Sequence, residues 1–561
     1  MNGSFSITPT FDAEWGCQTS RYTHRITLLL ALLVSGAILA IQFPIFIYSP
    51  DGSFHTAKIL RVTQGDYFSD PFTGVETIYP SLFHIFYGLI KCAIGFNSIQ
   101  IIQVIVLVDF LALFAAFYYC ATAFLQNAEE ASLCVLSLSL VIYAPTSHYI
   151  LLPEPSSFSF VFVLLSIGAL YRYAMHSSAG YLILGSLTGS LAVNIWWPNF
   201  FSFLAIVVVL AYHLLRNRKP PALHVAIFIF ASLVPCMHTA WHLYSIRDIF
   251  PYYFSGTTRQ GHVAVYDILI SWIVTFLTKG NLPFMHHMNL WDPSEASSRT
   301  TNLLASGTRR LHAIASAIHY FVLVMPFNFF LVAFAIVNLF QKETTTMCPR
   351  LGLLRTLAMG GFAVLLCSSM VLFLDNDVGK VRRVHFIISI MFLLFAFATA
   401  PVVVHSVWLQ KSILYIKVAA ICALAYTVVY SPRLFTSKLP EPDNAIIQFI
   451  GSIPDRNHQR IFMFGDGLRR VAPFVRLQSF VELNQGKYYH QDPHTAFDLY
   501  QDFMIMKEKS NGWKSVAREK NIKWIILRTS EAAELEMLRR YESDGVLQYK
   551  NRDWAALELN L

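Results

Sequence analysis

Long apolar runs separated by short polar connections occupy most of the chain, and this pattern predicts its main elements. Each run has about 20 apolar residues, the length that an α-helix needs to cross a bilayer. The runs recur at about 26–48, 99–124, 131–151, 157–175, 180–198, 199–215, 222–245, 313–340, 353–374, 385–409 and 412–431. The pattern therefore predicts a multi-pass α-helical membrane protein with about eleven transmembrane helices.

Basic residues give these helices a direction. Arg21 and Arg25 precede the first run and place the N-terminus, residues 1–25, in the cytoplasm, because Lys and Arg concentrate on that side of a membrane. In the same register Arg216, Arg218 and Lys411 also fall in cytoplasmic loops. The long loops 49–98 and 246–312 and the C-terminal tail then lie on the outer side. Within those loops, Tyr79–Phe96 and Ile268–Leu277 are predicted to be interfacial helices.

The tail from about residue 440 differs from the rest because it is polar and mixes strand and helix patterns. Apolar runs at 461–464 and 524–527 are typical of buried strands. Glu531–Tyr541 has helical spacing, with Ser530 as its expected N-cap. Alternating segments at Val546–Tyr549 and Trp554–Leu559 predict a terminal hairpin. We therefore expect a small extracytoplasmic α/β domain at 440–561.

Composition narrows the functional class. Of 561 residues, 55% are hydrophobic and 14% are charged, which excludes both a set of soluble domains and a disordered chain. The net charge of +8 is explained by membrane-flanking loops, so no nucleic-acid partner is expected. The eight cysteines show no disulfide framework or zinc spacing. No Walker loop, dinucleotide fingerprint or nucleophile elbow appears, which argues against direct ATP or NAD chemistry.

The first acidic residue beyond the first apolar run is Asp51, in the sequence Tyr48-Ser-Pro-Asp51-Gly-Ser-Phe-His55. A carboxylate close to the hydrocarbon boundary is costly, which favours a functional role. A second interpretation is that Asp51 caps the short helix predicted from His55 to Gly65, since Asp is a favoured N-cap residue. The two roles are compatible, and spacing alone does not separate them.

The motifs of this loop resemble those of a known superfamily. Asp51-x-x-x-His55, an amphipathic segment to Gly65-Asp66 and then Tyr79-Pro80-Ser81-Leu82-Phe83-His84 are similar to the first outer loop of the GT-C membrane glycosyltransferases. The strand-like Asn521–Leu527, followed by a helix and a closing hairpin, is similar to the domains that end many of these enzymes. The resemblance implies a GT-C-like transmembrane domain at 26–431 and indicates no particular family.

The resemblance further implies a sugar transferase that uses a polyprenyl-phosphate-linked donor. Asp51 matches the carboxylate that acts as general base or orients the acceptor, with His55, Asp66 and Asp70 as possible support in the same loop. Glu154 matches the position of a second acid, although it stands alone between two prolines, as a residue of a tight turn also would. Members that bind a divalent metal there have paired acids, so no cofactor or metal is assigned here, and a metal has only weak support.

A lipid phosphate leaving group needs positive charge on the outer side. Lys380, Arg382 and Arg383 lie there as candidate phosphate-binding residues, although pairing with Asp375 and Asp377 would equally make a solvated loop. Arg309 and Arg310 are a second candidate pair. The adjacent His286 and His287 lack a third metal ligand at suitable spacing.

Two classes of function remain after this reading. The first is a membrane glycosyltransferase whose acceptor is a glycan, a lipid or a protein and whose compact loops favour a prokaryotic plasma (inner) membrane. The alternative is a transporter or lipid flippase, which would need ionisable residues within the spans and usually two related halves. Asp109 is the one acid well inside a predicted span, and no repeat relates the halves. Both observations favour the enzyme.

Overall fold

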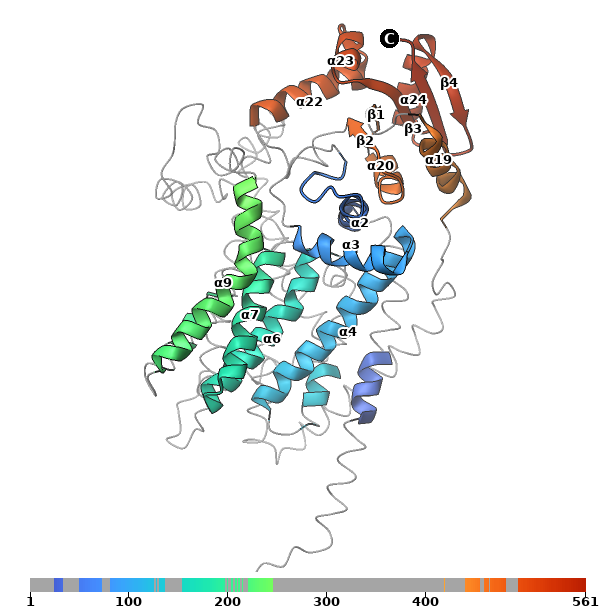
Figure 1. The fold of residues 1–561 in the computed structure, drawn as a ribbon. Coiled ribbons are helices and arrows are strands. Elements are labelled where there is room, and N and C mark those ends of the chain that lie inside the picture. Colours follow the sequence, from blue (N-terminus) through green and yellow to red (C-terminus); the bar gives the residue numbers. More distant parts are fainter. Residues whose placement is uncertain are drawn as a thin grey trace, which may run out of the picture.

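The computed structural model describes two regions of the chain and, between them in space, two short helices that precede both in the sequence (Figure 1). The described ranges are 25–33, 50–72, 81–125, 131–136, 154–196, 220–245, 439–454, 459–463, 465–480 and 493–561, with some single residues between them. A bundle of helices forms one region, and a C-terminal α/β unit lies beyond its end. Helices α2 (Pro50–Val62) and α3 (Leu82–Ile94) lie between the two.

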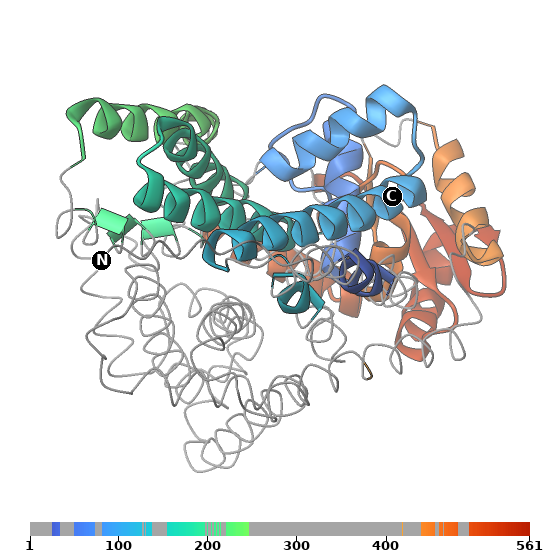
Figure 2. The same ribbon diagram turned by 90° about the horizontal axis from the view of Figure 1, so that it is seen from below.

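Four long helices form the described bundle. They are α4 (Ser98–Phe124), α6 (Pro155–His176), α7 (Ala179–Ile195) and α9 (Ala222–Ser245). Helix α6 packs between α4 and α7, and α7 packs between α6 and α9 (Figure 2). Among the described helices, α4, α6 and the segment Ala222–Trp241 of α9 are long and apolar enough to cross a membrane.

These helices follow the apolar runs that the sequence shows. Residues 25–33 and 131–136 are also helical, at the starts of two further runs. The runs at 313–340, 353–374, 385–409 and 412–431, most of 199–215 and the segment Ile268–Leu277 lie outside the described residues. The total of about eleven helices therefore stays a prediction.

Local sequence explains how α4 begins and how α7 packs against α6. The Asn97 side chain accepts a hydrogen bond from the Gln100 backbone N–H at 2.8 Å, and the Gln100 side chain accepts one from the Asn97 backbone at 2.9 Å. This capping box starts α4 by satisfying two amides that the helix leaves unpaired. Helix α7 approaches α6 closely because Gly185 has no side chain: a Cβ there would lie 2.5 Å from Leu170 Cγ.

The C-terminal unit has a five-stranded sheet in the order β2-β1-β3-β5-β4. Its elements are α19 (Glu441–Ser452), β1 (Arg460–Phe462), α20 (Gly465–Val471), β2 (Gln478–Phe480), α22 (Pro493–Glu508), α23 (Trp513–Glu519), β3 (Ile522–Arg528), α24 (Ala532–Tyr541), η2 (Glu542–Asp544), β4 (Gly545–Lys550) and β5 (Trp554–Leu559). Strand β1 is parallel to β2 and β3, whereas β5 is antiparallel to β3 and β4.

Alternation along the strands gives this sheet two buried faces. Trp524 and Ile526 of β3 belong to the core with α19 and α20, whereas Ile525 and Leu527 belong to the core with α22, α23 and α24. The alternating segments at the C-terminus form the hairpin of β4 and β5, as predicted. The N-cap of α24 is Glu531, so the prediction of Ser530 as the cap was wrong. Propensity favours Ser at this position, but the backbone becomes helical one residue later than the spacing indicated.

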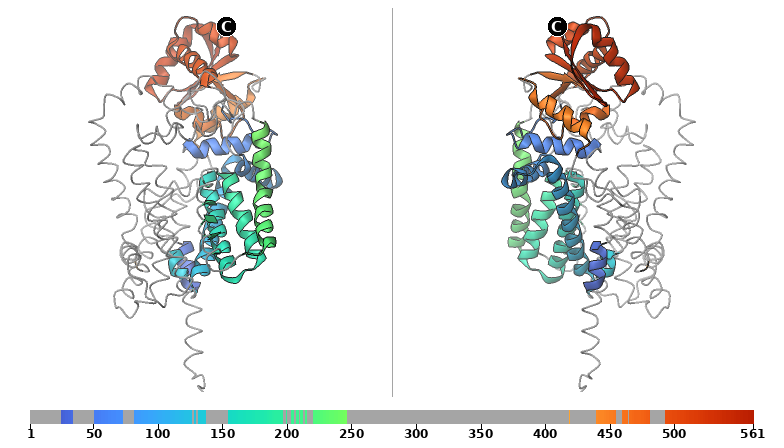
Figure 3. Two further views of the ribbon diagram at one scale, coloured as in Figure 1. Left: turned by 90° about the vertical axis from the view of Figure 1, so that its left-hand side faces the viewer. Right: turned by 90° about the vertical axis from the view of Figure 1, so that its right-hand side faces the viewer.

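Helix α2 lies across the end of the bundle, directly beneath the C-terminal unit (Figure 3). Its Phe54 and Ala57 belong to the same core as α19 and α20. Its Ile59 belongs instead to a core with residues of α3, α4, α6 and α7. Neighbouring residues of one helix therefore pack in both regions, and this packing fixes where the segment 50–72 lies.

Candidate active site in the first outer loop

Asp51 is the second residue of α2, which starts at Pro50. Proline is favoured at the first position of a helix because its fixed φ suits the helix and its missing N–H is not needed there. The expectation that Asp51 occupies the cap position of a helix beginning at His55 was therefore wrong. The helix begins earlier and includes Asp51 in its first turn. The residue next expected on the same helix face, four positions later, is His55.

His55 contacts α3 through a histidine pair. Its Nδ1 lies 2.9 Å from Nε2 of His84, and both rings are buried. In such a contact one nitrogen donates its N–H and the other accepts it, so the accepting nitrogen carries no proton. The rings of Phe54 and Phe83 stand edge-on to His55. This pair joins the two short helices one turn after Asp51, and His84 was not among the predicted site residues.

Arg61 connects the loop to the C-terminal unit. Its Nε donates to the Pro71 carbonyl at 2.9 Å, and its two terminal nitrogens donate to Asp66 Oδ2 at 3.1 Å and to the Leu477 carbonyl at 2.7 Å. The guanidinium is 2% exposed, so each of these bonds compensates for lost hydration. Asp66 also lies 4.0 Å from Arg476. The predicted support residue Asp66 therefore holds Arg61 in place.

Lys58 lies one turn before Arg61 and is fully buried. Burial lowers its pKa to about 8, while the charges of Asp70 and Asp66 oppose that change. Asp70 is also buried and accepts a hydrogen bond from the Phe72 backbone N–H at 2.9 Å. Asp70 therefore closes a turn and supplies negative charge near Lys58. The resemblance to a known loop gave Asp70 as possible support, whereas no sequence signal marked Lys58 or Arg61.

Glu154 occupies the N-cap position of α6, immediately before Pro155. Its backbone is extended, and its carboxylate accepts a hydrogen bond from the Ser156 hydroxyl. One turn later Phe158 contacts Phe83 and Tyr87 of α3, with ring centroids 5.7 Å and 5.6 Å apart. Glu154 thus lies at the end of the bundle that faces α3. It is buried at a helix start, where the sequence also allowed a tight turn.

The remaining candidate residues are not among those that the structure describes. Lys380, Arg382, Arg383, Arg309 and Arg310 lie outside the described residues, as do His286 and His287. Within the described ranges, no three His, Cys, Asp or Glu side chains gather as a metal site. The described part of the site is therefore the first turns of α2, the histidine pair and the start of α6.

Comparison with solved structures finds an oligosaccharyltransferase and two structures of ArnT. An Archaeoglobus fulgidus oligosaccharyltransferase, solved with a tethered acceptor peptide containing the NVT sequon, matches 96% of this chain and 74% of its own length, with 11% identity and a TM-score of 0.49. ArnT from Cupriavidus metallidurans bound to undecaprenyl phosphate matches 95% of this chain and 97% of its own, with 11% identity and a TM-score of 0.41. The corresponding values for its apo state are 94%, 97%, 12% and 0.40.

These matches indicate no particular family. At TM-scores below 0.5 they assign no role to any residue of this chain. No protein-family model matches the sequence, and no curated protein sequence is detectably related to it. The site must therefore be judged by its own residues.

Proposed function

We propose that this protein is a membrane glycosyltransferase that transfers a sugar from a polyprenyl-(di)phosphate donor to an acceptor on the extracytoplasmic side. The observation that carries the proposal is the placement of α2. The helix bears Asp51 in its first turn and is fixed between the bundle and the C-terminal unit by Phe54, Ile59 and Arg61. An acid at the junction of a membrane region and an α/β unit is well placed to act on a substrate that has a lipid part and a polar part.

The proposed chemistry uses Asp51 as a general base. An acceptor hydroxyl is a weak nucleophile, so the carboxylate takes its proton as the hydroxyl oxygen bonds to the anomeric carbon of the donor sugar. The bond from that carbon to the phosphate oxygen breaks, and its electron pair leaves with the lipid phosphate. Arg382 or Arg383, with Lys380, would stabilise the added negative charge. The acceptor in this proposal is a glycan, a lipid or a protein.

The alternative of a transporter or flippase gains no support from the described residues. Asp109 of α4, the acid within a predicted span, is buried and accepts a hydrogen bond from the Tyr87 hydroxyl. This contact joins α3 to α4, which is a packing role. We therefore retain the transferase, with the cytoplasmic N-terminus and the prokaryotic inner membrane as parts of the same proposal.

The decisive experiment replaces Asp51 by Asn. Sugar transfer from a polyprenyl-phosphate-linked donor is measured with purified protein in detergent, where a transporter has no compartments to act between. Asp51→Asn keeps the size of the side chain but removes the proton acceptor, so the rate should fall by about 10²–10⁴. Asp553→Asn, a partly exposed site on the C-terminal unit, is the matched control and should retain the wild-type rate. Wild-type transfer by a folded Asp51→Asn protein would exclude the catalytic assignment.

A further inference from the structure

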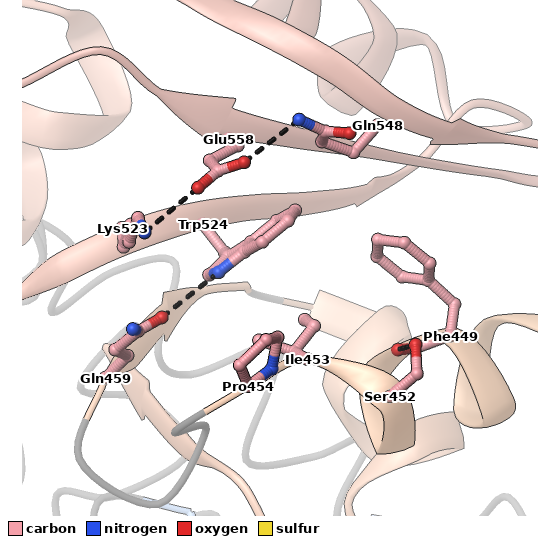
Figure 4. Close-up of a pocket in the computed structure, with 9 residues that line it drawn as sticks. All are labelled: Phe449, Ser452, Ile453, Pro454, Gln459, Lys523, Trp524, Gln548 and Glu558. Atoms are coloured by element: carbon pink, nitrogen blue, oxygen red, sulfur yellow. Dashed lines mark hydrogen bonds and ion pairs between the residues drawn. The ribbon is translucent and has the colours of Figure 1, made fainter.

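A cleft of about 260 Å³ opens in the C-terminal unit (Figure 4). Its walls come from the end of α19, the turn that follows it, the residue before β1, and strands β3, β4 and β5. No residue of α2, α3 or the bundle helices lines it. The cleft is smaller than the roughly 300–1,000 Å³ typical of pockets for drug-sized ligands, so its occupant is the size of one or two small rings.

The charges in the cleft cancel one another. Lys523 Nζ lies 3.0 Å from Glu558 Oε1, and Gln548 Nε2 donates to Glu558 Oε2 at 2.9 Å. Both carboxylate oxygens therefore have a partner, and the lysine is paired. A phosphate or a nucleotide would require an excess of positive charge, which this lining lacks. The lining thus favours a neutral ligand.

Two amides in the cleft are oriented by their neighbours. Trp524 Nε1 donates to Gln459 Oε1 at 3.2 Å, which leaves the NH₂ end of Gln459 as a donor. Gln548 uses its Nε2 on Glu558, which leaves its Oε1 as an acceptor. The lining therefore offers an acceptor, Gln548 Oε1, on an amide that the fold orients, whereas the Gln459 nitrogen is turned away from Phe449 and Gln548 (Figure 4). A ligand hydroxyl can donate to the Gln548 oxygen.

An aromatic wall completes the cleft. Phe449 stacks on Tyr549 with ring centroids 4.8 Å apart and meets Trp524 edge-on at 5.7 Å. These contacts hold the Phe449 ring in one orientation, and Ile453 and Pro454 extend the apolar surface beside it. A sugar ring has C–H groups on its faces and hydroxyls around its rim. An apolar wall bordered by an oriented amide is complementary to that shape.

We propose that this cleft binds a neutral saccharide, holding one or two sugar units of a glycan outside the transfer site. The binding goes beyond the proposed transfer reaction and needs no donor turnover. Binding and transfer can therefore fail independently of each other, and each can be tested without the other.

The test is saturation-transfer NMR on the full-length protein in lipid nanodiscs, since alkyl-maltoside detergents themselves carry a sugar. The probes are maltotriose and the methyl glycosides of glucose, galactose, mannose and N-acetylglucosamine. We expect at least one probe to receive saturation at millimolar concentration. Gln548→Ala and Phe449→Ala should each weaken its binding by at least about tenfold, because each removes a contact that a hydroxyl or a ring face would use.

Two controls make the result specific. Gln501→Ala alters an exposed glutamine of α22 outside the cleft and should bind as the wild type does. Asp51→Asn should also bind normally, which separates this site from the proposed catalytic one. Hydrogen exchange in β3 and β5 verifies that each variant is folded. If Phe449→Ala unfolds, Gln548→Ala and Glu558→Gln decide the matter, because both lie at the cleft rim.

Several outcomes would overturn the proposal. These are the absence of saturation of every probe, undiminished binding by the cleft variants, and binding of inorganic phosphate or of a Ser-containing or Thr-containing tripeptide in place of the sugars. None of these outcomes would bear on the transfer reaction, which the Asp51→Asn experiment tests separately.

Discussion

Helices α2 and α3 follow the same apolar run and each has 13 residues, yet among them only α2 buries Lys and Arg side chains. Helix α3 buries Phe83 and Tyr87 in a core shared with α4, α6 and α7. Helix α2 buries the cations Lys58 and Arg61 as well as its apolar residues. The histidine pair His55 and His84 joins the two.

The contrast shows two ways to fix a helix on a membrane protein. Apolar packing in α3 is non-directional and tolerates small shifts, since its free energy depends mainly on buried area. The hydrogen bonds of Arg61 are directional and require three acceptors at fixed positions. A helix that carries a proposed catalytic acid benefits from the second arrangement, because productive geometry tolerates errors of only about 0.5 Å.

The largest expected effect comes from Phe83→Ala in α3. Removing this buried ring should lower the free energy of unfolding by about 3–5 kcal/mol. Hydrogen exchange should rise in α3 and in the neighbouring ends of α4 and α6, while β3 and β5 keep their protection. Phe86→Ala, on the same helix at a site 42% exposed, is the control and should cost less. An equal loss of protection in β3 and β5 would show that the packing of α3 also stabilises the C-terminal sheet, against this prediction.

Arg61→Met should have the next largest effect and the opposite distribution. It removes the charge-assisted hydrogen bonds to the Pro71 and Leu477 carbonyls, which should cost about 2–3 kcal/mol. Exchange should rise at 66–72 and in the segment from α20 to β2, with α3 unchanged. Arg61→Lys should restore only part of the loss, because an ammonium lacks the guanidinium fork. The exposed Arg539→Met is the control, and unchanged exchange at 465–480 would contradict the coupling.

The smallest effect is a pH dependence that α2 should show. The pKa of Lys58 is lowered to about 8 in the folded protein from its ordinary 10.5. Between these values the unfolded chain holds a proton that the folded protein has released, so stability rises with pH. From pH 8 to 9.5 the wild type should gain about 1.5 kcal/mol relative to Lys58→Met, measured from the two melting temperatures. Lys550→Met, at an exposed site, should parallel the wild type. If the stability of Lys58→Met changed with pH as that of the wild type does, the lowered pKa of Lys58 would be refuted.

Sequence patterns predicted those elements whose signals are local. The apolar run 99–124 agrees closely with α4, and the alternation at the C-terminus agrees with β4 and β5. Helix starts were predicted less well. Pro50 and Pro155 both stand at the first position of a helix, and reading them so would have placed Asp51 and Glu154 correctly.

The contacts that complete the candidate site could not be predicted from the sequence. The acceptor for Arg61 at Leu477 is a backbone carbonyl, a group that every residue carries, so no pattern of side chains marks it. The pairing of His55 with His84 depends on how α2 and α3 cross, and that crossing is set by the two cores on either side of α2. Asp51 became a candidate through its position beside the predicted hydrocarbon boundary and through the resemblance to a known loop, and His55 through that resemblance alone.

The Arg61 contact also orders events during synthesis. Its acceptor carbonyl at Leu477 is 416 residues further along the chain. At translation speeds of about 5–20 residues per second, the ribosome needs about 20–80 s to reach that partner after Arg61 has emerged. During this interval the nascent helix has no C-terminal unit on which to bury its cation. The proposed catalytic loop therefore reaches its final form only when nearly the whole polypeptide has been made, so a prematurely terminated chain would be left without a finished site.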